Sequence, residues 1–391
     1  MSVWDFVDQE LQECEKNHLK KPLIFQRRNL QQIEIIVDGK SAIDFTSNNY
    51  LGLAGHPTLK KRAEEFLNLY GTGSASSRLI SGNLDCYDAI EKKIALLKKT
   101  EAALIFSSGY QANCSVLPTL ADRHSLLLLD RLCHSSLAQG AKLSGGSVVR
   151  FRHNDTSHLH QLLKKHTSKK NYSRILIISE SIFSMDGDGA PIDELIQLAE
   201  KFHCLLYLDE AHATGVLGHN GMGLSVGRKG LHITMGTFSK ALGSYGAYVA
   251  CSSSLKDYLV NFCKGFIYTT ALPPPVLGSM DAALDLIPSM DQERKMLQKQ
   301  SAKLRKILQD QGWNTGASSS QIIPIITKQE ETTLDLCENL LKKQIYTVAI
   351  RPPSVPKGQC RIRFSLTTLH TEEHLSHLIR TMEELSHIYL C

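Results

Sequence analysis

The 391-residue sequence predicts an α/β protein, in which a large domain built on a mostly parallel, seven-stranded sheet precedes a smaller C-terminal α+β domain. Two observations predict this class. Up to about residue 285, short continuous apolar runs alternate with helical patterns, as expected for strands buried on both faces of a parallel sheet. After the prolines at 273–275, a long amphipathic stretch leads into mixed strands and helices, which is typical of a separate α+β domain.

The segments of the first two thirds of the chain follow in order. Residues 1 to about 30 are expected to form a helical arm, and Ile33–Val37 and Ala42–Phe45 to form a small hairpin. Helices are expected over Tyr87–Lys99 and Pro191–Phe202, the latter with proline at its start. The predicted strands of the large sheet are Ala102–Phe106, Leu126–Asp130, Val148–Phe151, Ile175–Ser179, Leu205–Asp209, Ile233–Thr237 and Ala247–Cys251.

The C-terminal third is expected to begin with a long amphipathic helix near Ser289, where Gln292 completes a capping box. The later elements are strands over Gln321–Ile326, Thr347–Arg351 and Arg361–Leu366, and helices over Thr333–Lys343 and Glu372–Tyr389. The expected organisation is therefore an arm and hairpin over residues 1–46, a large domain over 47–285 and a small domain over 286–391.

The composition indicates an ordinary globular protein, with 42% hydrophobic and 21% charged residues. The formal net charge of +5, from 44 basic and 39 acidic residues, is small and spread along the chain. Such a charge does not predict a nucleic-acid partner, but it would favour an anionic substrate.

The ten cysteines indicate where the protein works. None lies in a CxxC spacing and several lie inside apolar runs, so we expect reduced thiols in the cytoplasm and neither a disulfide framework nor a metal site. The first residues carry acids where a signal peptide needs bases, and no apolar run approaches the ~20 residues that span a bilayer. We therefore expect no membrane partner.

Two neighbouring strands end in residues that can carry chemistry. Leu205–Asp209 runs into Asp209-Glu210-Ala211-His212, and Ile233–Thr237 runs into a loop with Lys240. Both ends are expected at the same edge of the sheet, where ligands bind in open α/β folds. A carboxylate, an imidazole and an amine in one cleft are what pyridoxal phosphate requires, for its ring nitrogen and for its aldehyde.

The same residues also allow other interpretations. Taken singly, Asp209 could be a helix cap, His212 a structural histidine and Lys240 a surface lysine. A nucleotide-driven protein with the Asp-Glu-Ala-His string would need a phosphate loop of the form GxxxxGK[ST], but position 34 before Gly39-Lys40-Ser41 is glutamate. A relative that binds the cofactor without catalysis also stays open, although an intact Lys240 counts against it.

Further strand ends fit the same cofactor. Ser107–Gln111 follows a strand and opens a helix, so the N–H groups of Gly109 and Tyr110 could hold a phosphate. His134 follows the next strand and could stack on the ring, and Ser184 could reach its phenolic oxygen. Each of these residues could instead serve a plain turn or loop.

Taken together, the motifs resemble those of the α-oxoamine synthases. These are fold-type I pyridoxal-phosphate enzymes, which join an amino acid to an acyl thioester with loss of CO2. The resemblance runs from about Asp44 to Leu366. Its motifs are Ser47–Leu53, Arg78–Gly82, Phe183–Asp188, Asp209–Gly215, Thr237–Gly243 and Tyr268–Pro274.

The resemblance implies roles for the cofactor site. Lys240 would hold the cofactor as a Schiff base, Asp209 would pair with the pyridine nitrogen, and His134 would stack on the ring and face the substrate; these three are the candidate catalytic residues. His212 and Ser184 would lie near the phenolic oxygen. The remaining cofactor contacts, all to phosphate, would come from Gly109, Tyr110 and Thr237, and from Thr269 or Thr270 of the other subunit of a homodimer.

The resemblance also implies a substrate site. Arg351 and Asn48 would bind the amino-acid carboxylate, and Ser354 would lie near the acyl substrate. Lys20 or Lys21 would stand where family members often have an arginine in the arm.

The segment Ile350–Pro356 resembles the substrate segment of one branch of the family, which condenses L-alanine with a pimeloyl thioester, carried by coenzyme A or by acyl carrier protein. An arginine in this segment can bind a carboxylate through two parallel hydrogen bonds. Branches that use glycine or make α-aminoketone signals stay open as alternatives.

Overall fold

The computed structural model describes residues 3–168 and 172–390. Their contacts divide the chain into two compact units. The large unit consists of Asn49–Ser184 and Gly189–Lys295, and the small unit of Met1–Asn48, Met185–Asp188 and Met296–Cys391. The domain boundaries expected at 46/47 and 285/286 stay a prediction.

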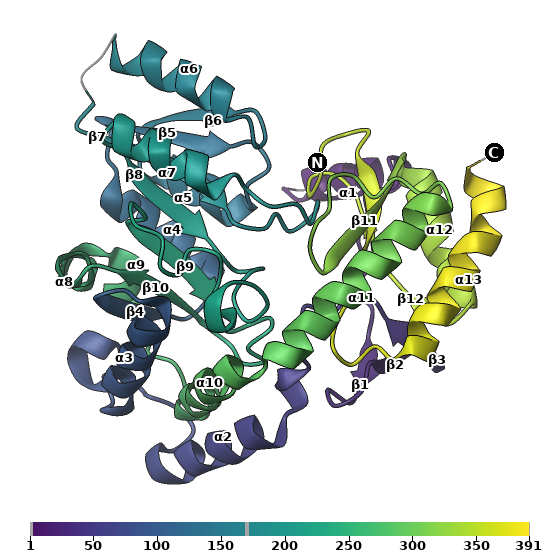
Figure 1. The fold of residues 1–391 in the computed structure, drawn as a ribbon, viewed down its shortest axis with the longest axis horizontal. Coiled ribbons are helices and arrows are strands. Elements are labelled where there is room, and N and C mark those ends of the chain that lie inside the picture. The colour runs from purple at the N-terminus through teal and green to yellow at the C-terminus, as the bar shows by residue number, and fades with distance from the viewer. Residues whose placement is uncertain (1–2, 169–171, 391) are drawn as a thin grey trace. The chain divides into compact units, whose positions relative to one another are not determined.

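The large unit is built on the seven-stranded sheet that the sequence predicts (Figure 1). Its strands lie in the order β4-β10-β9-β8-β7-β5-β6. Strand β10 alone runs opposite to the other strands of the sheet, and the strands from β9 to β6 are parallel throughout. The strand bounds are β4 Ala102–Phe106, β5 Ser125–Asp130, β6 Ser147–Phe151, β7 Arg174–Glu180, β8 Leu205–Asp209, β9 Ile233–Thr237 and β10 Ala247–Cys251.

Helices cover both faces of this sheet because the central strands are buried on both sides. In β5, Leu127 and Leu129 pack in the cluster with α4, α5, α8 and α9, while Leu126 and Leu128 pack with α6 and α7. The helices of this unit are α2 Pro57–Tyr70, α3 Cys86–Lys98, α4 Gly109–Leu120, α5 Ser135–Leu143, α6 Thr156–Thr167, α7 Ile192–Lys201, α8 Ser253–Phe262, α9 Lys264–Ile267 and α10 Pro274–Leu286. Short helical turns are η1 Leu53–Gly55, η2 Arg78–Gly82, η3 His219–Gly221 and η4 Ile287–Ser289.

The small unit combines two further sheets with helices. One sheet has the order β1-β2-β3-β12 and the other β11-β14-β13. The strands are β1 Gln26–Arg28, β2 Glu34–Val37, β3 Lys40–Asp44, β11 Ile322–Lys328, β12 Ile345–Tyr346, β13 Ala349–Ile350 and β14 Cys360–Ser365. The helices are α1 Asp5–Lys16, α12 Glu330–Lys342 and α13 Glu372–Tyr389, while α11 Asp291–Asp310 runs from the large unit into this one.

Three local predictions were wrong. The arm is helical only to Lys16, and Gln26–Arg28 instead pairs antiparallel with β2. Ser289 does not cap the long helix, because its hydroxyl donates to the carbonyl of Leu286 and the helix begins at Asp291. The predicted strand Thr347–Arg351 shortens to β13, which pairs with β14 through two residues.

The hairpin has a partner that its own sequence does not reveal. Strand β3 pairs in parallel with β12, so Ile43 lies opposite Ile345, about three hundred positions further along the chain. The N-terminal strands and the C-terminal segment therefore belong to one sheet.

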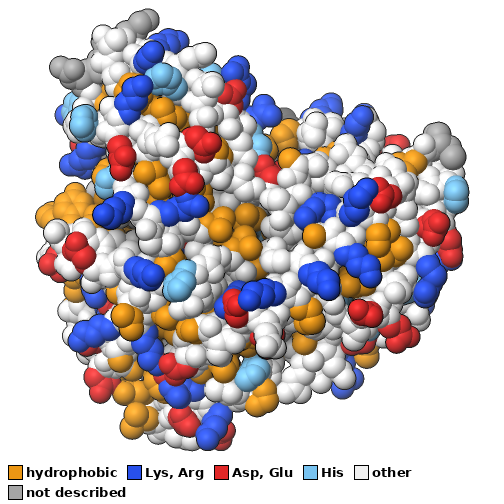
Figure 2. All heavy atoms as spheres, in the orientation of Figure 1, with side chains coloured by type: hydrophobic (Ala, Val, Ile, Leu, Met, Phe, Trp, Pro, Cys, Tyr) orange, Lys and Arg blue, Asp and Glu red, His pale blue; other side chains and the backbone are white. Residues whose placement is uncertain are grey.

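The surface charges and the cysteines match what the composition predicts, namely mixed charge (Figure 2) and reduced thiols. On the face drawn in Figure 2, basic and acidic side chains lie interspersed. Every cysteine in the part of the chain that the structure describes is a free thiol, and Cys391 lies outside that part. Among the described residues, no helix is long and apolar enough to cross a membrane.

Candidate active site

A cavity of about 210 Å³ opens at the carboxyl ends of the parallel strands of the large unit. This is the edge where open α/β sheets bind their ligands. The residues that line the cavity are Gly109, Tyr110, Asn113, His134, Ser136, Glu180, Asp209, Ala211, His212, Met235, Thr237, Ser239 and Lys240. Seven of them were predicted as cofactor-binding residues: Gly109, Tyr110, His134, Asp209, His212, Thr237 and Lys240.

Asp209, the last residue of β8, is held by two hydrogen bonds. The Asn113 amide donates to Oδ2 at 2.9 Å, and the backbone N–H of Ala211 donates to Oδ1 at 2.9 Å. Asn113 is oriented in turn by Tyr207, whose hydroxyl donates to its Oδ1 at 2.7 Å. These bonds fix the direction of a carboxylate that is only 5% exposed.

Lys240 lies beside His212, and both residues line the cavity. Its Nζ is 2.8 Å from Nε2 of His212, and Nδ1 of His212 is 2.7 Å from the hydroxyl of Tyr50. Tyr50 and His212 are buried, so this row of three polar groups leads from the cavity into the protein. An amine in such a row can exchange a proton with a fixed neighbour.

His134 and Glu180 form the opposite side of the cavity. Nδ1 of His134 lies 2.8 Å from the hydroxyl of Ser136, and the backbone N–H of His134 donates to the Glu180 carboxyl. Burial lowers the pKa of His134, against the effect of Asp209 and together with that of Lys240. Burial and the nearby Asp209 raise the pKa of Glu180 well above its usual range. Both shifts favour the neutral form of the group.

The start of α4 supplies donors to the same cavity. The Ser108 side chain accepts from the N–H of Gln111, which leaves the earlier N–H groups of this first turn, those of Gly109 and Tyr110, for an anion. Thr237 lines the cavity too, and its hydroxyl donates to the carbonyl of Gly246 at 2.9 Å while accepting from the N–H of Ser239.

The other predicted residues of the large unit lie elsewhere. Ser184 is buried at the end of the large unit's first segment. Thr269 and Thr270 line a separate cavity of about 20 Å³, and Thr270 forms an isolated β-bridge with Ser77.

Apart from His134, which lines the cavity, the predicted substrate residues belong to the small unit. The buried Arg351 guanidinium donates to the backbone carbonyls of His18 and Lys20 in the arm, and Oδ1 of Asn48 accepts from Arg363 at 2.9 Å. The ammonium of Lys20 pairs with Glu15 at 3.2 Å. Ser354, the last of the set, is exposed.

Several polar residues of the cavity were missed from the sequence. Asn113 and Ser136 lie on helices, where single polar residues carry little signal. Asn113 follows Gly109 by four positions, and this helical spacing could have placed it at the same edge. Glu180 directly follows the predicted strand Ile175–Ser179, and this position at a strand end could have placed it at the same edge.

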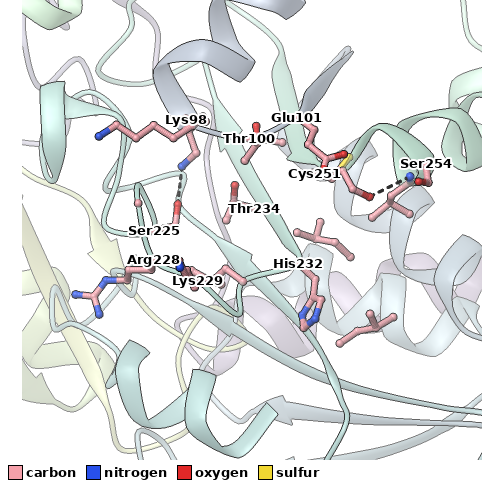
Figure 3. A pocket seen from close by; sticks show the side chains of 18 of the residues that line it. Lys98, Thr100, Glu101, Ser225, Arg228, Lys229, His232, Thr234, Cys251 and Ser254 are labelled. Carbon is pink, nitrogen blue, oxygen red and sulfur yellow. Dashed lines mark hydrogen bonds between the residues drawn. The ribbon is translucent and has the colours of Figure 1, made fainter. Parts of the chain in front are cut away.

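A larger cavity, of about 650 Å³, lies at the opposite ends of the same strands (Figure 3). It is lined by Leu205 and Ile233, the first residues of β8 and β9, and by Lys98 of α3. In α/β sheets, catalysis belongs to the carboxyl ends, so the smaller cavity is the candidate active site.

A model of the aminotransferase class I and II family matches residues 40–382. This span contains the whole seven-stranded sheet and every residue that lines the candidate active site. The chain therefore belongs to the class I and II aminotransferase family.

Similar proteins point to one group within that family. An 8-amino-7-oxononanoate synthase from Gluconacetobacter diazotrophicus is 44% identical over 386 residues, which cover 97% of this chain and 96% of the relative. A solved 8-amino-7-oxononanoate synthase from Francisella tularensis is 27% identical, with a TM-score of 0.77 over 90% of this chain and 99% of that one. A serine palmitoyltransferase from S. paucimobilis, solved with bound pyridoxal phosphate and myriocin, is 25% identical, with a TM-score of 0.91 over 100% and 99%. The expected resemblance to the α-oxoamine synthases is confirmed.

Proposed function

We propose that the protein condenses L-alanine with a pimeloyl thioester, releasing CO2 and the free thiol and forming 8-amino-7-oxononanoate for biotin synthesis. The observation that carries this proposal is the 44% identity, over nearly the whole chain, to a relative that bears the name of that synthase. The free thiols of the described cysteines suit a reaction in the cytoplasm.

The protein is an acyltransferase, and its cofactor is pyridoxal phosphate. The residues of the cavity fit this group by their chemistry. The cavity offers a carboxylate, an amine, a neutral imidazole and the N-terminus of a twelve-residue helix, which suit a pyridine nitrogen, an aldehyde, a flat ring and a phosphate respectively. When bound, pyridoxal phosphate supplies an electron sink for the charge left on the α-carbon of the amino acid.

The residues of the large unit would bind the cofactor and transfer the proton of the α-carbon. The Lys240 amine is the group that would bind the cofactor's aldehyde and later take and return the proton of the α-carbon, while its contact with His212 fixes its position. Asp209, held in direction by Asn113 and Ala211, would keep the pyridine nitrogen protonated. Ser184 would assist His212 at the phenolic oxygen.

The substrate contacts are proposed from the small unit. Arg351 and Asn48 would bind the amino-acid carboxylate, with Ser354 and Lys20 toward the acyl thioester. Arg351 suits this role because its buried guanidinium has an Nε without a partner among the described residues, so it keeps a donor for a carboxylate.

A homodimer is proposed to complete the site, with Thr269 or Thr270 reaching the phosphate bound by the other subunit. Exposed apolar side chains near these threonines support it: Ile80 and Tyr268 are each 81% exposed, and the bridge from Ser77 to Thr270 holds the turn of Ile80 close by. Large exposed apolar side chains that cluster in this way mark protein interfaces.

The test starts with the absorbance spectrum of the purified protein with pyridoxal phosphate. We expect a long-wavelength band that is lost in Lys240→Ala and kept in Lys201→Ala, a lysine at the end of α7. Addition of L-alanine should change the band, and pimeloyl-coenzyme A or pimeloyl-acyl carrier protein should then release CO2 and thiol. A Lys240→Ala protein with normal turnover would contradict the assignment of Lys240.

A second candidate is another α-oxoamine synthase, such as a glycine C-acetyltransferase or an α-aminoketone synthase. The high TM-score of 0.91 to a serine palmitoyltransferase favours keeping it, because the family shares one backbone for different amino acids. A response to glycine or L-serine that exceeds the response to L-alanine, without turnover of either pimeloyl thioester, would select this candidate.

A further inference from the structure

We propose that the buried ion pair between Lys98 and Glu210, together with Ser225, is a positioning device that holds the turn carrying Asp209 and His212. The inference rests on the proposed function, because these two residues matter for catalysis only if they serve the cofactor. All of the residues involved lie in the large unit.

The ion pair is fully buried, and every donor of its ammonium group forms a hydrogen bond. The Lys98 ammonium donates to the Glu210 carboxylate, to the carbonyl of Met222 at 2.8 Å and to the hydroxyl of Ser225 at 2.7 Å. These three bonds use all the donors of an ammonium group. The other carboxylate oxygen of Glu210 accepts from the N–H of Ser225 at 2.9 Å. The two side chains are 1% and 0% exposed.

Such a pair needs a reason, because burying two charges costs about as much as their attraction returns. Burial by itself would lower the pKa of Lys98, but Glu210 and Tyr248 together raise that pKa above its usual value, so the lysine stays charged. The backbone is shaped around the carboxylate. Gly223 has a φ of +97°, and a Cβ there would lie 2.5 Å from Glu210 Oε2.

Glu210 links this buried pair to the active site through its backbone. It directly follows Asp209, and its N–H donates to the carbonyl of Met235 at 2.7 Å, which ties the end of β8 to β9. Its carbonyl accepts from Ala213 at 3.0 Å and from Thr214 at 2.8 Å. These bonds close the turn that contains His212.

The end of the same turn packs closely against the loop that carries Lys240. A Cβ at Gly215 would collide with the side chain of Ala241, the residue after Lys240. A shift of the Glu210 turn would therefore move Asp209, His212 and the neighbour of Lys240 together. Lys98 thus acts on the site from outside the candidate active-site cavity. Figure 3 shows its bond to Ser225 at the wall of the larger cavity.

The experiment compares two double variants that each remove a lysine of helix α3 and its carboxylate partner. Lys98→Met with Glu210→Gln removes both charges of the proposed device. The control is Lys93→Met with Asp281→Asn, which removes the ion pair between the same helix and α10, together with the contacts of Lys93 with Asp285 and of Asp281 with Arg62. Four quantities are measured: the unfolding midpoint, the dissociation constant of pyridoxal phosphate, the visible circular dichroism of the bound cofactor, and kcat and KM for the amino acid.

We expect both double variants to fold. The Lys98/Glu210 variant should show altered visible circular dichroism, weaker cofactor binding and a kcat lower by about 10- to 100-fold, as for a small misplacement of catalytic groups. Its KM should change less than its kcat. The Lys93/Asp281 control should keep the wild-type dichroism and kcat, even if its unfolding midpoint falls.

A Lys98/Glu210 variant with wild-type dichroism, cofactor affinity and kcat would overturn the proposal, whatever its stability. If that variant does not fold, Ser225→Ala decides instead. It removes the hydroxyl that accepts from Lys98 and donates to Glu210, and it keeps both charges. A change of dichroism supports the proposal, and its absence overturns it. Cofactor binding and dichroism need no turnover. They therefore test the device even if the proposed substrates prove wrong, and a protein that binds no pyridoxal phosphate would defeat the proposed function itself.

Discussion

At the scale of single residues, the candidate site depends on polar groups whose charge is set by burial. Glu180 and Asp209 are both buried and influence each other, and only Asp209 is held by donors on both oxygens. When the surroundings of two nearby carboxyl groups push their pKa values apart, the two groups usually have different roles. Here Asp209 accepts hydrogen bonds from Asn113 and Ala211, and Glu180 accepts from the backbone N–H of His134.

The raised pKa of Glu180 predicts how Glu180→Gln changes stability. A carboxyl whose folded-state pKa is raised stabilises the fold below its unfolded pKa of about 4.3, and this contribution is lost as the pH rises toward the folded pKa. Glutamine keeps the acceptor for His134 and does not ionise. In the apoprotein, the unfolding free energy of the variant relative to wild type should therefore increase from pH 5 to pH 8, by at most about 1.4 kcal/mol per pH unit.

Denaturant unfolding at several pH values measures this difference. Glu194→Gln, on the exposed side of α7, serves as the control and should give a curve parallel to that of wild type. A Glu180→Gln curve that also runs parallel to wild type would show that Glu180 ionises normally.

At the scale of elements, two packed helices bring the site together. Helix α4 carries Asn113 and α5 carries Ser136, and the Asn113 amide donates to the Ser136 hydroxyl at 2.9 Å. The helices approach closely because α5 has glycine at position 140. A Cβ at this position would collide with the backbone carbonyl of Asn113.

Gly140→Ala should therefore separate α4 from α5 and displace Asn113 from Asp209. Because the obstacle is backbone, which yields less than a side chain, we expect a loss of about 1–3 kcal/mol in the free energy of unfolding. The dissociation constant of pyridoxal phosphate should rise as well. Gln139→Ala, at the exposed neighbouring position of α5, should stay within about 0.5 kcal/mol of wild type.

At the scale of the whole molecule, stability also draws on buried groups far from the site. In the small unit, His370 is 2% exposed and stacks on Phe45 with ring centroids 4.4 Å apart. Its Nδ1 accepts from the N–H of Thr367 at 3.0 Å. Burial lowers the pKa of His370 to about 3.

This shift predicts an acid-sensitive fold. A histidine with a depressed folded-state pKa stabilises the protein above its unfolded pKa of about 6.5, and the contribution is lost as the pH falls toward 3. Between pH 6.5 and pH 5, His370 alone should remove about 2 kcal/mol from the unfolding free energy. His370→Asn keeps an acceptor for Thr367 and should flatten this part of the pH profile. Equal slopes for variant and wild type would count against a buried neutral histidine.

The large sheet and much of the site could be predicted from local pattern. All seven strands lie where the apolar runs placed them, because a strand buried on both faces needs a continuous apolar stretch. Asp209, Thr237 and Lys240 could be placed together, because parallel strands end at one edge. The prediction of a helical arm up to residue 30 was wrong, because residues 26–28 form a strand only by pairing with β2.

The strands, their common edge and the residue types at that edge follow from local sequence, since they depend on side chains within a few positions of one another. Which distant polar groups meet depends on the packed fold. Asn113 reaches Asp209 across 96 positions, and Lys98 reaches Glu210 across 112. The strand β12 likewise completes the sheet of the N-terminal hairpin. The physical reason is that such contacts depend on how whole elements pack, and no periodicity along the chain encodes the partner of a single buried polar group.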